Sequence, residues 1–141
     1  MSASTVAAGQ TRRTPTWMVW LGRLMSLVPV FVVLSSSRWK LTQNPWYVQQ
    51  WTHIGWPVPA LPQIASLQLI AIVLYLIPQT AVLGAVLLTG YLGGAIASYV
   101  RIGEWYPPLV PFTTAVLAWG GLWFRDARIR ALLPFRLGVR P

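Results

Sequence analysis

The feature that most constrains this chain is a run of sixty residues, 41–100, that contains no Asp, Glu, Lys or Arg. A soluble surface carries about 25–35% charged residues, whereas the whole chain of 141 residues carries 9%. Its mean hydropathy is +0.56, and 55% of its residues are hydrophobic. This composition is typical of a membrane protein whose solvent over most of its length is lipid.

Four apolar runs approach the length of about 20 residues that a membrane-spanning helix needs. They cover residues 17–34, 61–77, 81–100 and 109–124. We therefore predict an all-α fold, a polytopic membrane protein built as a four-transmembrane-helix bundle. On this division, the chain has a flexible N-terminal leader at 1–16, a membrane domain at 17–124 and a basic amphipathic tail at 125–141.

The first apolar run also has features of a signal peptide. Arg12 and Arg13 precede it, and three small serines follow it. Cleavage there is the alternative to a first span, but Arg23 interrupts the apolar run. A first membrane span is the favoured interpretation.

A short helix is predicted at residues 45–54, within the long connection 35–63 between the first two spans. Asn44 can cap the N-terminus of this helix, and Pro45 suits its first position. Its tryptophans alternate with glutamines and threonine. Such a helix is expected to lie in the membrane interface instead of crossing the membrane.

Basic residues flank the predicted spans, and the chain has a formal net charge of +9. In a soluble protein this excess would indicate nucleic-acid binding, but anionic headgroups and membrane topology explain it better here, so no nucleic acid is expected. With four spans, one side carries Arg12, Arg13 and five tail arginines, against Arg38, Lys40 and Arg101 on the other. This bias places both termini in the cytoplasm, and we expect a multi-pass protein of the bacterial inner membrane.

The composition restricts the chemistry that the chain could perform alone. It contains no cysteine, a single histidine, His53, and two carboxylates, Glu104 and Asp126. The absence of cysteine excludes disulfides, thiolate chemistry and iron–sulfur ligation within the chain. Two lone carboxylates also argue against paired acid–base catalysis. The sequence therefore predicts no metal site and no catalytic residue, and it favours a protein that is not itself an enzyme.

Four residues within the predicted spans are candidates for binding a cofactor, with a quinone or a lipid as the ligand: Arg23, Gln68, Tyr75 and Tyr91. An arginine within a span costs about 2.5–3.5 kcal/mol on insertion scales, so Arg23 either holds an anionic or carbonyl group or extends to the headgroups. Gln68 and Tyr75 are seven residues apart and share a helix face. Packing between helices is the alternative role for Gln68 and the tyrosines.

Gly90, Gly94 and Ser98 form a small-residue face in the third span, against which a second helix of the same chain is expected to pack. Polar and aromatic residues near the span ends are candidates for contact with lipids or partner subunits: Arg38, Lys40, Trp46, Trp51, His53, Arg125, Arg128 and Arg130. His53 could instead ligate haem, chlorophyll or a metal, although an ordinary interfacial histidine is the favoured interpretation.

The stretch at Val73–Gly103, VLYLIPQTAVLGAVLLTGYLGGAIASYVRIG, closely resembles the DoxX-like family of small membrane proteins. The segment at 119–136, WGGLWFRDARIRALLPFR, is also similar, as is the pattern of Gly22, Arg23 and Ser26 in the first span. The resemblance implies a four-helix membrane bundle. The wider group includes a subunit of thiosulfate:quinone oxidoreductase and proteins tied to redox maintenance or to membrane-protein maturation.

The resemblance also implies residue correspondences. The arginine of the family's first helix corresponds to Arg23, and the lysine after that helix corresponds to Lys40. Related sequences often carry a glutamate in the second helix where this chain has Gln68, in ASLQLI. Because a glutamine forms hydrogen bonds but cannot titrate, a carboxylate that pairs with Arg23 or moves a proton is missing, which argues against proton-coupled chemistry.

Two functional hypotheses follow. The first is a non-catalytic accessory or stabilising subunit of a larger respiratory or photosynthetic membrane complex, because small-residue helix faces and aromatic loops suit contact with other membrane subunits. The second, which the resemblance implies, is a quinone- or lipid-binding redox component of the thiosulfate:quinone oxidoreductase type. A small transporter is less favoured, because the sequence lacks inverted repeats and broken helices.

Overall fold

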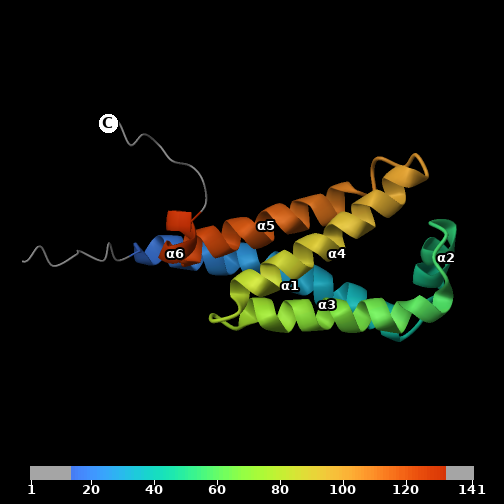
Figure 1. Cartoon of the computed structure of the whole chain (residues 1–141), viewed down its shortest axis with the longest axis horizontal. Helices are drawn as coiled ribbons and strands as arrows, with labels where there is room; N and C mark the ends of the chain where they lie inside the picture. Colours follow the sequence, from blue (N-terminus) through green and yellow to red (C-terminus); the bar gives the residue numbers. More distant parts are fainter. Residues whose placement is uncertain (1–13, 133–141) are drawn as a thin grey trace, which may run out of the picture.

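The computed structural model describes residues 14–132, and this part of the chain contains helices and no strand. Four long helices run between two ends of the molecule, with the short helix α2 (Pro45–His53) at one end and α6 (Ala127–Leu132) at the other (Figure 1). The leader arginines, Arg12 and Arg13, and the last two tail arginines lie outside the described residues.

Helix α1 (Thr16–Leu41) extends well beyond the predicted first span, which ended at residue 34. The serines that follow remain helical, and one of them supports the helix through its hydroxyl: Ser37 Oγ donates to Val33 O, one turn earlier, at 2.8 Å. The prediction that the connection begins at residue 35 is therefore wrong. As a consequence, Lys40 belongs to the helix and faces its neighbours instead of lying in a loop.

Helix α2 begins at Pro45, and Asn44 Oδ1 accepts a hydrogen bond from Trp46 N at 3.1 Å. This is the cap that an Asn-Pro sequence favours. The inward face of the helix carries Trp51, which is buried in a small cluster with Ile54 and Leu61. Helix α2 is therefore attached by its apolar face to the start of the helix that follows it.

The remaining long helices begin at the first residues of the predicted apolar runs. They are α3 (Leu61–Leu76), preceded by the 3-10 turn η1 (Val58–Ala60), α4 (Ala81–Arg101) and α5 (Leu109–Arg125). Apolar side chains fill these segments, and Pro, Gly and polar residues separate them, as expected for helices that end where lipid ends.

Each of the four long helices packs against two others. Helix α1 contacts α3 and α5, and α4 contacts the same two helices from the other side. Glycines allow two close approaches of helix backbones: a Cβ built on Gly84 of α4 would collide with Tyr75 N of α3, and one built on Gly22 of α1 would lie 2.8 Å from Gly121 O of α5. Small residues permit these approaches of two backbones, which supply much of the packing energy in lipid.

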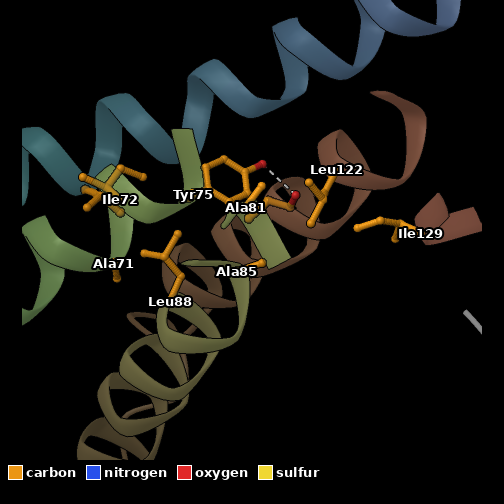
Figure 2. Close-up of a cluster of buried hydrophobic side chains, with 10 residues drawn as sticks. Ala71, Ile72, Tyr75, Ala81, Ala85, Leu88, Leu122 and Ile129 are labelled. Atoms are coloured by element: carbon orange, nitrogen blue, oxygen red, sulfur yellow. Dashed lines mark hydrogen bonds between the residues drawn. The ribbon is translucent and has the colours of Figure 1, made fainter. Parts of the chain in front are cut away.

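The main apolar core lies where α1, α3, α4 and α5 converge. Tyr75 is fully buried there, among Ala81, Ala85 and Leu122 (Figure 2). Its hydroxyl donates to Ala118 O at 2.8 Å, so the polar end of the ring is satisfied inside the protein.

The outer faces of the helices are apolar, with exposed side chains such as Phe31, Ile70 and Phe112. Three helices within the described residues are long and apolar enough to cross a membrane: Thr16–Leu41, Val58–Leu76 and Ala81–Arg101. Helix α5 has 17 residues. The protein is therefore a membrane protein with several apolar helices whose outward faces contact lipid.

Candidate functional site: an aromatic cavity beside a buried lysine

A cavity of about 300 Å³ lies between α2, α3 and α4, at the α2 end of the molecule. Six aromatic side chains line it: Trp46, Tyr47, Trp51, Trp56, Tyr91 and Tyr99. The remaining lining is mostly apolar and includes Ile64 and Leu67 from α3. Its volume is at the lower end of the range of about 300–1,000 Å³ that is typical of small-molecule sites.

Two tryptophans form a fixed wall of this cavity. The indole nitrogen of Trp51 donates to Pro57 O at 3.0 Å, and that of Trp56 donates to Ser98 Oγ at 3.0 Å. The ring centroids of the two side chains are 5.7 Å apart. Because both polar ends are bonded, these rings are held in place and present apolar faces to the cavity.

Lys40 lies directly behind the aromatic lining and is 0% exposed. Its Nζ donates to Gln68 Oε1 and to Tyr91 Oη, both at 2.5 Å. The same atom lies 4.6 Å from the centroid of the Tyr91 ring and 5.5 Å from that of Tyr47. One buried amino group therefore connects α1, α2, α3 and α4.

Gln68 completes this buried polar cluster. Its amide nitrogen donates to Val33 O at 3.1 Å, while its oxygen accepts from Lys40. Gln68 is 1% exposed, so both ends of its amide are satisfied within the protein. No carboxylate pairs with Lys40 among the described residues, since the only ion pair there joins His53 to Glu104.

The phenol groups at the cavity differ in what they can offer a ligand. Tyr91 Oη accepts from Lys40, and its hydroxyl also interacts with the hydroxyls of Ser36 and Tyr47. Tyr47 Oη lies 3.3 Å from Ser36 Oγ, and burial raises the pKa of Tyr47 above its ordinary value. Tyr91 is therefore a lining residue of the cavity whose hydroxyl belongs to a small polar cluster, and Lys40 polarises that hydroxyl.

The four cofactor candidates predicted from the sequence do not form one site. Tyr91 lines the aromatic cavity. Gln68 does not line it, but Lys40 donates hydrogen bonds to both Gln68 and Tyr91 and so links the two residues. Arg23 is exposed and lines a different cavity near the other end of α1. Tyr75 lines neither cavity, because its hydroxyl is bonded inside the core.

Gly90 and Gly94 of α4 do not pack against another helix within the described residues. A Cβ built on Gly90 or Gly94 meets nothing within 4 Å, and both glycines line the aromatic cavity. Ser98 is buried, and its hydroxyl donates to Gly94 O and accepts a hydrogen bond from Trp56 Nε1. Close contacts between helices lie instead at Gly84, where α4 meets α3, and at Gly22 and Gly121, where α1 meets α5.

Most of the proposed contact residues lie on the surface at the two ends of the molecule. At the α2 end, Arg38 and Trp46 are exposed, and His53 Nε2 lies 2.7 Å from Glu104 Oε1. At the α6 end, Arg128 is exposed. Arg130 is half-buried, and its guanidinium donates to Trp123 O, Phe124 O and Thr14 Oγ1. The described residues contain no cluster of three or more His, Cys, Asp or Glu that could hold a metal ion.

Sequence reasoning missed the burial of Lys40, which it grouped with the surface contacts. The signal was present in the spacing of the inward residues of α1, which include Gly22, Ser26, Val33, Ser37 and Lys40. These positions recur every three or four residues, the period of one helix face. Lys40 lies on that face, so it is buried although it is close to the helix end.

Comparison with known proteins identifies the family of the chain. The model of the DoxX-like family matches residues 24–121. The match includes α2, α3 and α4, and hence every element that lines the aromatic cavity. Neither a search of curated proteins nor a search of solved structures found a match.

Proposed function

Because the chain belongs to the DoxX-like family, we propose that it is an integral membrane protein that binds the ring of a quinone-type lipid in its aromatic cavity. The observation that supports this most directly is the hydroxyl of Tyr91. It lines the cavity and accepts a hydrogen bond from Lys40, which makes its own O–H a stronger donor. A quinone carbonyl is an acceptor that this donor can satisfy.

The walls of the cavity suit a flat and largely apolar ring. Trp51 and Trp56 are held rigidly by their indole hydrogen bonds, and aromatic faces attract other flat rings. Gly90 and Gly94 leave a strip of the α4 backbone within the cavity lining uncovered by side chains. An isoprenoid tail can leave along this open strip toward the lipid, so the proposed ligand is a membrane quinone.

In this proposal the protein binds and orients the ligand, and the chain itself performs no electron transfer. It contains no cysteine and one histidine, so it offers no thiolate for an iron–sulfur cluster. A partner subunit would exchange electrons with the bound ring. The proposal thus joins the expected quinone site to the expected accessory role within a larger complex.

The open strip on α4 also supports a second candidate function, that of an accessory subunit that binds no quinone. A helix of another subunit could approach the α4 backbone closely at Gly90 and Gly94, where a Cβ meets nothing within 4 Å. A pull-down in mild detergent followed by mass spectrometry tests this candidate. Stoichiometric partner subunits support it, and a protein recovered alone contradicts it.

We further propose that α5 crosses the membrane as the fourth span, in the bacterial inner membrane, with both termini in the cytoplasm. Its 17 residues span about 25 Å at about 1.5 Å per residue, slightly less than the hydrocarbon core of about 30 Å. Local thinning of the bilayer accommodates such a difference. Active alkaline phosphatase fused to the C-terminus would contradict this topology.

Binding of the soluble quinone analogue decylubiquinone tests the proposed site. Titration into the protein in mild detergent should quench the fluorescence of the cavity tryptophans in a saturable way. Tyr91→Phe removes the donor and should weaken binding about ten-fold, the usual effect of one lost hydrogen bond. Tyr106→Phe is the matched control, because Tyr106 is 85% exposed and outside the cavity. Equal affinities of the two variants would overturn the proposal.

A further inference from the structure

A second cavity of about 340 Å³ lies toward the α6 end of the molecule, between α1, the α3–α4 connection and α5. Two arginines line it, Arg23 from α1 and Arg125 from the end of α5. Its other walls include Val19, Leu76 and Leu122, which are apolar. The cavity therefore places two guanidinium groups beside a surface that is suited to hydrocarbon.

Arg125 is held in position by the buried core. Its Nη2 donates to Tyr75 O at 3.1 Å, and its Cζ lies 4.9 Å from the centroid of the Tyr75 ring. A guanidinium has five N–H donors, and the described residues accept from one nitrogen only. The remaining donors are available to a ligand, and their orientation is already fixed.

Arg23 is less constrained. It forms no hydrogen bond or ion pair with any described residue, and its Cζ lies 5.4 Å from the centroid of the exposed Trp20 ring. Tryptophans of this kind favour the headgroup region of a membrane. The Arg23 guanidinium is therefore available at the depth where lipid phosphates lie.

One carboxylate, Asp126, also lines the cavity. It does not neutralise the arginines, because no described cation lies within ion-pair distance of it. Its Oδ1 instead accepts a hydrogen bond from the backbone of Arg128 at 2.8 Å, at the start of α6. Two positive charges against one negative charge leave the cavity lining with a net positive charge.

We propose that this cavity binds the phosphate of one anionic phospholipid, with Arg23 and Arg125 as the donors and the acyl chains lying along Val19 and Leu76. Basic pockets between membrane helices bind anionic headgroups by this combination of charge and apolar surface. A lipid with a net negative headgroup is preferred over a zwitterionic one, because a choline or ethanolamine cation would be repelled by the same guanidinium groups. This proposal does not depend on the quinone site.

Thermal unfolding of the detergent-purified full chain tests the proposal with three probes: dioctanoyl phosphatidylglycerol, dioctanoyl phosphatidylcholine and inorganic phosphate. Phosphatidylglycerol should raise the unfolding midpoint in a saturable way, since a ligand that binds only the native state stabilises it. Phosphatidylcholine and inorganic phosphate at equal concentration should raise it little. An equal shift with phosphatidylcholine would overturn the lipid proposal in favour of an unselective detergent effect. An equal shift with inorganic phosphate would overturn it in favour of a free-phosphate site.

Variants locate the effect. Arg23→Gln removes a guanidinium that has no described partner, so the protein should fold and its affinity for phosphatidylglycerol should fall about ten-fold. Arg128→Gln is the matched control, because Arg128 is exposed and lies outside the cavity. Arg125→Gln should weaken binding at least as much. An unchanged affinity in Arg23→Gln, or an equal loss in Arg128→Gln, would overturn the proposal.

Discussion

Lys40 and Arg23 are both basic side chains of α1, yet their surroundings are opposite. Lys40 lies one residue before the end of the helix and is 0% exposed. Arg23 lies within the apolar part of the same helix and is exposed, next to an open cavity. The difference shows that the face of a membrane helix, and not the position along it, decides which polar side chain is buried.

The reason lies in the neighbours of each face. The buried residues of α1, from Gly22 to Lys40, follow a helical period of three or four and face α3 and α5. Arg23 is one residue away from that stripe and points outward. Small residues such as Ser26 and Ser37 mark the stripe, so it is recognisable in the sequence before any helix is placed.

The largest expected effect separates the two basic residues directly. Lys40→Ala leaves a void and removes the donor to Gln68 Oε1 and Tyr91 Oη, so it should lower the free energy of unfolding by about 3 kcal/mol. Arg23→Ala should change it by less than about 0.5 kcal/mol, as for a surface substitution. Unfolding in mixed micelles measures both. Equal losses would contradict the opposite surroundings of the two residues.

A second prediction concerns the partner of Lys40. With Lys40 present, Gln68→Glu should change the unfolding free energy by less than about 1 kcal/mol, because the new carboxylate pairs with the buried amino group. In the Lys40→Ala background it should cost about 3–5 kcal/mol, the usual effect of an unpaired buried charge. The double-mutant cycle measures this coupling. A coupling near zero would show that residue 68 does not face Lys40.

This pairing also corrects an inference from the family resemblance. The missing glutamate was expected to pair with Arg23 or to move a proton, but residue 68 contacts Lys40 and not Arg23. The sequence alone could not distinguish the two, since both basic residues belong to the same helix. Only the packing of α3 against α1 decides which of them residue 68 meets.

A third prediction compares two glycines: Gly121, on a helix face that is packed closely against another helix, and Gly94, on a face that is open. Gly121→Ala would force α1 and α5 apart, because the added Cβ would lie 2.9 Å from Gly22 O, and it should cost about 1–3 kcal/mol. Gly94→Ala meets nothing within 4 Å and should stabilise the isolated protein by about 0.5–1 kcal/mol through helix propensity. A cost at Gly94 similar to that at Gly121 would contradict the open face.

Much of the fold could be predicted from the sequence. The starts of α3, α4 and α5 follow from the first residues of their apolar runs, and the start of α2 follows from Asn44 and Pro45. The end of α1 could not be predicted in the same way. Consecutive serines with Arg38 resemble a loop in composition, although their hydroxyls can bond within a helix, as Ser37 does with Val33 O.

The candidate site was only partly predictable. Gln68 and Tyr91 were recognised as polar residues within spans, but their partner, Lys40, was assigned to the surface. The separation of Arg23 from Gln68 depends on which helices pack together, and a single sequence does not contain that information. Aromatic residues of α2 were assigned to the interface, and the structure additionally makes Tyr47 and Trp51 part of a cavity wall.

The smallest expected effect concerns the only charge pair that joins two described side chains, His53 and Glu104. It connects α2 to the α4–α5 connection at 2.7 Å, but its side chains are 53% and 36% exposed. Exposed pairs contribute about 0.2–1 kcal/mol, so Glu104→Gln should lower the unfolding free energy by less than about 1 kcal/mol. Unfolding at pH 5 and pH 9 measures the contribution. A loss of unfolding free energy as large as that of Lys40→Ala would contradict this prediction. It would mean that an exposed ion pair stabilises this end of the molecule as much as the buried lysine does, so that buried and exposed basic residues would not differ.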